Sequence, residues 1–160
     1  MMFKTFEKEI GDNKYTIVAF TGSNGLDLMF EFVGYASTAL KLFSSDLTSS
    51  FSLKSILETS LQEGAIDKVI DSMQEMLLVK DSRDKLIHFI RRLVADTTRN
   101  GKEDLGKKEL FDMIFSANYE ELFVLVKEVI VVNFFSQSFI KKMIAKNLQQ
   151  EQPSSENKTQ

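Results

Sequence analysis

The spacing of apolar residues changes once along the chain, from a short strand-like segment to the three-and-four spacing typical of helices. Residues 15–20 are rich in β-branched and aromatic side chains, and they follow the turn sequence Gly11–Lys14. This pattern predicts an N-terminal β-hairpin over about residues 2–20. Because an isolated hairpin is only marginally stable in water, we expect it to pack on another element.

After the sequence Thr21–Gly25, apolar residues recur every three or four positions, which predicts a series of amphipathic helices. Gly34 lies inside the first of them, where glycine costs about 1 kcal/mol relative to Ala, and we interpret it as the mark of a close helix crossing. The expected fold class is mainly α, with an N-terminal β-hairpin packed on a bundle of about five or six helices. The predicted helices cover about residues 26–43, 53–61, 66–77, 81–94, 110–115 and 119–148.

Local turn and capping signals separate the last three predicted helices. The segment Asp96–Gly106 has the composition of a loop and contains the tight-turn dipeptide Asn100-Gly101. Asn118 is a good N-cap residue, and Glu121 three positions later completes a capping-box-like pattern. We therefore expect the last helix to begin directly after Asn118.

The predicted last helix is apolar almost all the way round, from Leu122 to Ile144. A helix that is apolar on every side must be buried on every side, so this helix is expected to be the centre of the bundle or part of an interface. The polar segment 149–160 contains the chain's only Pro and cannot join a core. We expect one helical domain over residues 1–148 and a flexible polar tail over 149–160.

Composition narrows the class of function. Apolar residues make up 43% and charged residues 27% of the chain, which is ordinary for a globular protein. The net charge is −3, and Lys and Arg are spread out, whereas nucleic-acid binding needs clustered positive charge. The absence of Cys excludes disulfides and thiolate metal sites. Charges come too early for a signal peptide, and no apolar run reaches the roughly 18 residues of a membrane span, so we expect neither a nucleic-acid nor a membrane partner.

Catalytic signatures are missing from the sequence. His88 is the sole histidine, and the sequence offers it no nucleophile or acid partner, so a helix-surface histidine is the simpler interpretation. The G-x-x-G sequence Gly22–Gly25 stands between a predicted strand and a predicted helix but lacks the Lys-Ser/Thr of a phosphate-binding loop. Metal sites need several ligands at suitable spacings, which the acidic residues do not provide. We expect no enzyme activity, no cofactor and no metal.

Three segments of the chain carry a combination of hydrophobic patterns, a turn and an Asn-Phe-Phe sequence within the predicted last helix. The segments are Lys4–Ile17 followed by Gly25–Phe30, Asp96–Lys102 with Phe111–Phe115, and Glu121–Phe135. In this order they resemble the tail assembly chaperones of long-tailed bacteriophages, and the resemblance covers most of residues 4–140.

The resemblance implies a small helical protein made in the cytoplasm of the infected bacterial host. Such chaperones bind the tape-measure protein, keep it soluble and help recruit tail-tube protein subunits, and they are absent from the mature virion. They also tend to self-associate. Adaptable Met and Phe surfaces suit a protein that must bind many similar helical sites, and this chain has 7 Met and 14 Phe.

Partner contact is expected to come from the last helix. The candidate residues are Phe123, Phe134, Phe135, Phe139 and Ile140, with Asn133 as a polar specifier. A buried Asn can fix register at a cost in stability, and the alternative is a solvent-side Asn near a helix bend. Each Phe is equally well explained by an ordinary helical core.

Two other classes of protein fit the same sequence. One is a structural neck or tail protein that is retained in the virion. The other is a small helical adaptor or regulatory protein unrelated to phages. Neither class requires a catalytic site, and the hydrophobic pattern alone does not separate them from a chaperone.

Overall fold

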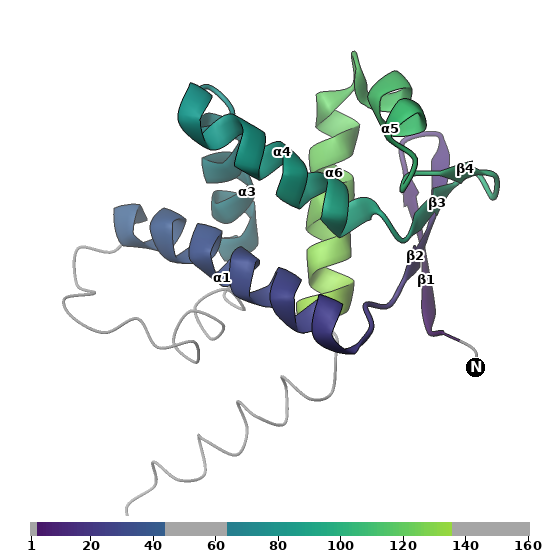
Figure 1. Cartoon of the computed structure of the whole chain (residues 1–160), viewed down its shortest axis with the longest axis horizontal. Coiled ribbons are helices and arrows are strands. Elements are labelled where there is room, and N and C mark those ends of the chain that lie inside the picture. Colours follow the sequence, from purple (N-terminus) through teal and green to yellow (C-terminus); the bar gives the residue numbers. More distant parts are fainter. Residues whose placement is uncertain (1–2, 44–63, 136–160) are drawn as a thin grey trace, which may run out of the picture.

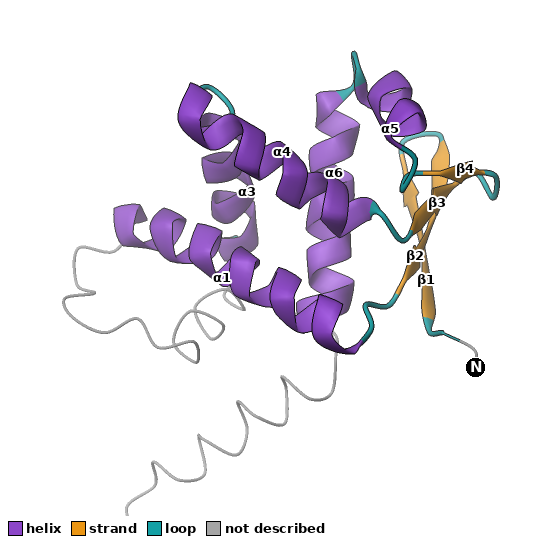
Figure 2. Cartoon of the chain, in the orientation of Figure 1, coloured by secondary structure: helices purple, strands orange, loops and turns teal. Residues whose placement is uncertain are grey.

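A helical layer lies beside a small antiparallel sheet in the computed structural model, which describes residues 3–43 and 64–135 (Figure 1, Figure 2). The fold is therefore mainly helical with an N-terminal strand pair, as expected. The predicted helix over 53–61, the part of the last helix beyond residue 135 and the predicted tail lie outside the described residues. The elements are β1 (Thr5–Ile10), β2 (Asn13–Val18), α1 (Gly22–Phe43), α3 (Ala65–Met76), α4 (Lys80–Val94), β3 (Thr97–Arg99), β4 (Glu103–Asp104), α5 (Lys108–Phe115), α6 (Tyr119–Ile130) and the π-helical turn η1 (Val131–Phe135).

The predicted N-terminal hairpin is confirmed. β1 pairs antiparallel with β2, and Ile10 faces Asn13 across a turn in which Gly11 has a φ of 58°, a conformation that favours glycine. Tyr15 and Ile17 of β2 are buried against the helices. Lys8, on the inner face of β1, reaches Glu128 of α6 with an Nζ–Oε2 distance of 2.9 Å. The hairpin thus packs on α6 through both apolar and charged contacts.

The segment Asp96–Gly106, expected to be a loop, instead contains two strands that complete a four-stranded sheet in the order β1-β2-β3-β4. The loop prediction is wrong because β3 and β4 have three and two residues, too short and polar to show a strand pattern. Pairing with the edge of β2 stabilises them. The tight turn is confirmed, since Asn100 and Gly101 both have positive φ, of 52° and 71°.

The first helix begins at Gly22, four residues before the expected start at Leu26. The Gly25 N–H donates to the Thr21 carbonyl at 3.0 Å, so the glycine-rich sequence forms the first helical turn. A Cβ on Gly25 would lie 3.0 Å from the Cβ of Phe20, which explains a glycine here without any ligand. Gly34 does not mark a helix crossing, because within the described chain a Cβ there would meet nothing within 4 Å.

α6 is the central helix, as its apolar circumference predicted. It contacts α3, α4, α5 and β1, and runs between the helical layer and the sheet (Figure 1). From Leu122 onward its side chains are buried on most of its circumference, whereas Tyr119, Glu120 and Val124 are exposed. The described helices contain none long and apolar enough to cross a membrane.

Asn133 fastens the end of α6 to the start of α1. Its side chain is 3% exposed, so the solvent-side alternative is wrong. Its Oδ1 accepts a hydrogen bond from the Phe20 N–H at 2.8 Å, and its Nδ2 donates to the Val129 carbonyl at 3.1 Å. The residue lies in η1, where the chain changes from α-helical to π-helical geometry. Asn133 therefore fixes the register of this chain's own core.

Asn133→Ala should lower the free energy of unfolding by about 2 kcal/mol, because the Phe20 N–H would lose its partner in a half-buried position. Urea denaturation monitored by circular dichroism measures the change. Asn24→Ala, at an exposed position of α1, is the control and should change stability by no more than about 0.5 kcal/mol. Equal effects of the two substitutions would contradict the role assigned to Asn133.

Candidate partner-binding groove

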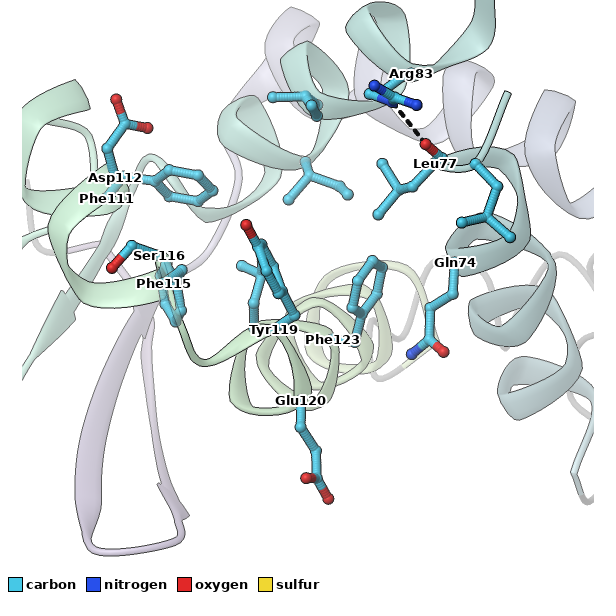
Figure 3. Close-up of a pocket in the computed structure, with 14 residues that line it drawn as sticks. Gln74, Leu77, Arg83, Phe111, Asp112, Phe115, Ser116, Tyr119, Glu120 and Phe123 are labelled. Atoms are coloured by element: carbon cyan, nitrogen blue, oxygen red, sulfur yellow. Dashed lines mark hydrogen bonds between the residues drawn. The ribbon is translucent and has the colours of Figure 1, made fainter. Parts of the chain in front are cut away.

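An apolar groove of about 840 Å³ opens where the turn between α3 and α4, the outer face of α4, α5 and the start of α6 meet (Figure 3). Four separate stretches of the chain contribute to it. The lining residues are Gln74, Leu77, Leu78, Arg83, Ile87, Ile90, Phe111, Asp112, Phe115, Ser116, Tyr119, Glu120, Leu122 and Phe123.

The groove combines a buried apolar floor with exposed apolar walls. Ile90 and Phe115 on the floor are each 2% exposed. On the walls, the exposed fractions are 81% for Leu78, 60% for Tyr119 and 40% for Ile87. A cluster of large apolar side chains left open to water around a concave surface is typical of a site that binds another apolar surface.

Hydrogen bonds to main-chain carbonyls hold the turn that carries Leu78. The Leu78 N–H donates to the Glu75 carbonyl at 3.0 Å, which continues the last turn of α3. The Arg83 Nε donates to the Leu77 carbonyl at 2.7 Å, and the Ser82 hydroxyl donates to the Met76 carbonyl at 2.9 Å. The turn therefore presents Leu78 to solvent in a fixed backbone conformation.

Aromatic rings form the opposite side of the groove. Phe111 and Phe115, one turn apart on α5, pack edge to face with their ring centroids 5.2 Å apart. Tyr119 and Phe123, one turn apart on α6, both point into the cavity, whereas Glu120 points away from it (Figure 3). The interior is thus apolar, and the Tyr119 hydroxyl provides a polar group at its centre.

A cluster of polar side chains behind the groove holds the first turn of α6 against the sheet. The predicted N-cap is confirmed, since the Asn118 Oδ1 accepts from the Glu121 N–H at 3.4 Å. The Glu121 carboxylate accepts hydrogen bonds from Asn13 at 2.9 Å, from Asn118 at 2.6 Å and from the Tyr15 hydroxyl. The Arg99 Nε lies 3.6 Å from the same carboxylate. Strands β2 and β3 are thereby joined to α6.

This cluster keeps Glu121 ionised and Tyr15 protonated. Burial acts to raise the pKa of Glu121, but hydrogen bonds from Tyr15, Asn118 and Asn13, together with the charge of Arg99, outweigh it and lower that pKa. Burial also raises the pKa of the Tyr15 phenol, and the bond to Glu121 raises it further. The tyrosine therefore stays a donor and the glutamate an acceptor at neutral pH.

Of the partner-contact residues expected from the sequence, only Phe123 lies in the groove, where it is 5% exposed. Phe134 and Phe135 belong to the core, with their rings 5.5 Å and 6.0 Å from that of Phe32. Partner contact by these two residues stays a prediction and would require their rings to leave the core. Phe139 and Ile140 lie outside the described residues.

Sequence reasoning missed the exposed residues Leu78, Ile87 and Tyr119. One signal was available, because the apolar pair Leu78-Val79 falls between two helices, where turns are usually polar. His88, the histidine considered as a catalytic residue, is exposed on α4. Residues 3–43 and 64–135 contain no group of three or more His, Asp or Glu residues that could hold a metal ion.

The described residues thus form a mainly helical frame with an open apolar groove, an arrangement typical of proteins that bind another apolar surface. A model of the phage tail assembly chaperone protein family, TAC, matches residues 11–149. The match covers most of the chain, so the protein belongs to this family, which confirms the resemblance. Searches of curated proteins and of solved structures gave no match.

Glu121→Gln should lower the free energy of unfolding at about pH 7 by about 1–2 kcal/mol, because charge-assisted hydrogen bonds are lost. The pKa of Glu121 is lowered on folding from the ordinary 4.5. The stabilisation is therefore complete above that value and is lost as the pH falls through the folded pKa. The gap between wild type and variant should shrink on going to about pH 3, as measured by urea denaturation.

Glu120→Gln is the matched control, since Glu120 is the exposed neighbour whose side chain points away from the groove. It should leave the stability nearly unchanged at both pH values. A gap for Glu121→Gln that is the same at both pH values would show that the charge of Glu121 is not what stabilises the cluster.

Proposed function

We propose that this chain binds the tape-measure protein of its phage, keeps it soluble and helps recruit tail-tube subunits around it in the host cytoplasm, and that it is absent from the mature virion. Family membership supports a chaperone role without catalysis. The single observation that carries the proposal is the groove, whose apolar walls are exposed at Leu78, Ile87 and Tyr119.

The shape and chemistry of the groove suit an amphipathic helix. Such a helix buries side chains at positions i, i+3 or i+4 and i+7 in an apolar groove, and its polar face stays in water. The floor of Ile90, Phe115 and Phe123 would receive those anchors, and Leu78 and Tyr119 would close over them. A long client rich in helices offers many such segments, which agrees with a coat built from many copies of a small chaperone.

Family membership favours a role in tail assembly over a regulator unrelated to phages. A structural tail protein retained in the virion is the remaining alternative. Mass spectrometry of purified particles separates these two roles, because a chaperone should be missing from them. The presence of the chain in particles at a fixed number of copies per tail would favour the structural role.

Self-association is part of the proposal, and α1 offers a surface for it. Leu26 and Phe30, one turn apart on α1, are 52% and 58% exposed. Gly34 follows one turn later, with open space where its Cβ would be. Two large apolar residues beside the small residue Gly34 suit close packing against the same surface of a second copy. Such a contact would explain the glycine in α1, for which the described part of a single chain gives no reason.

Ile87→Asp should reduce solubilisation of the tape-measure product about tenfold when the two are co-expressed, because a carboxylate in the apolar groove opposes burial of the client. The measurement is the soluble fraction of client and the amount that co-purifies. Met113→Asp is the matched control, since Met113 is 64% exposed on α5 but does not line the groove. Equal loss with both variants, or no loss with Ile87→Asp, would remove the groove from the proposal.

Phe30→Asp should shift the protein to a smaller assembly in size-exclusion chromatography with light scattering, because an exposed apolar contact would be replaced by a charge. The circular dichroism spectrum should not change, since Phe30 faces solvent. Lys102→Asp, at the exposed turn between β3 and β4, is the control. An unchanged mass for Phe30→Asp would exclude this surface as the self-association site.

A further inference from the structure

We propose that the groove selects amphipathic helices that carry acidic residues along the edge facing α4, an inference that rests on the proposed function and adds the chemistry of the client. The outer face of α4 carries Arg83, Ile87 and Arg91 at intervals of four residues, so all three lie on one side of the helix. At about 1.5 Å per residue, the two arginines are about 12 Å apart along the wall.

Both arginines stand beside the groove. Arg83 lines it at the turn between α3 and α4. The guanidinium carbon of Arg91 lies 5.9 Å from the ring centroid of Phe111, which itself lines the groove. The apolar residue between them, Ile87, belongs to the wall. The α4 side of the groove is therefore an apolar strip with a cation near each end.

These two cations have no carboxylate partner among the described residues, whereas the neighbouring Arg92 does. Arg92, on another face of α4, is paired with Glu31 and with Asp27, the latter at 2.6 Å. Arg83 uses its Nε to bind the Leu77 carbonyl, which leaves its terminal nitrogens available. The charge of Arg92 is thus paired within the fold, whereas the guanidinium groups of Arg83 and Arg91 are open to a ligand.

The opposite rim does not cancel this positive charge. Asp112 is paired with Lys108 of the same helix at 2.5 Å, and Glu120 points away from the cavity (Figure 3). The Tyr119 hydroxyl, which points into the cavity, can donate a hydrogen bond to an acidic ligand. A helix with apolar anchors and two acidic residues seven or eight positions apart on one flank would place a carboxylate near each arginine.

The test uses two synthetic peptide helices of about 18 residues, identical in their leucine stripe and each with one Trp. One carries glutamates on the flank beside the stripe and the other carries lysines there. The chain contains no Trp, so the fluorescence of the peptide Trp reports binding to the full-length protein directly. The acidic peptide should bind about tenfold more tightly at low salt, and the difference should shrink at about 0.5 M NaCl.

Substitution of the two arginines assigns the preference to α4. Arg91→Gln and Arg83→Gln should each reduce the preference for the acidic peptide to about threefold, and the double variant should abolish it. Arg91→Gln is the safer variant, because Arg83 also holds the turn through the Leu77 carbonyl. Lys102→Gln removes an exposed positive charge at the β3–β4 turn, which does not line the groove. It is the control and should leave the preference unchanged.

Equal binding of the two peptides, or a preference that survives the double variant, would overturn the inference while leaving the groove as a binding site. Binding of neither peptide would overturn it as well. The proposed function would fail separately, if the wild-type protein left the solubility of the co-expressed client unchanged.

Discussion

Burial of α6 between the helical layer and the sheet is the constraint on which the rest of this structure depends. An apolar helix of this kind is stable only when it is covered, and α3, α4, α5 and β1 each cover part of it. Apolar contact is non-directional, so it does not by itself determine the position of α6 along its axis. Hydrogen-bonded polar side chains at the two ends, Glu121 and Asn133, supply that information.

The two polar contacts act at opposite ends of the same helix. Glu121 ties its first turn to β2 and β3, and Asn133 ties its end to Phe20, in the connection between β2 and α1. Each side chain has several partners, so a shift of α6 by one residue would leave polar groups without partners, at a cost of about 1–3 kcal/mol each. The strands β2 and β3, the start of α1 and the helix α6 are thereby held in one register.

The groove is a consequence of this fixed position. Near the start of α6, Tyr119 and Phe123 point into the cavity that residues of α4 and α5 also line (Figure 3). Phe115 and Ile90 beneath them are buried in the core, whereas Leu78 and Ile87 remain exposed. The floor of the groove, with Ile90, Phe115 and Phe123, therefore also belongs to the core, whereas its exposed walls can change without loss of the core.

The sequence by itself determined the elements whose signals are local. Turn residues and β-branched residues defined the N-terminal hairpin, three-and-four spacing defined the helices, and Asn118 defined the start of α6. The strands β3 and β4 were decided only by tertiary structure, because such short polar segments become strands through pairing with β2. The same is true of the roles of individual apolar residues. A hydrophobic pattern shows that Phe134 and Ile87 each favour an apolar surrounding, but only their neighbours in space decide that Phe134 packs on Phe32 while Ile87 stays partly exposed.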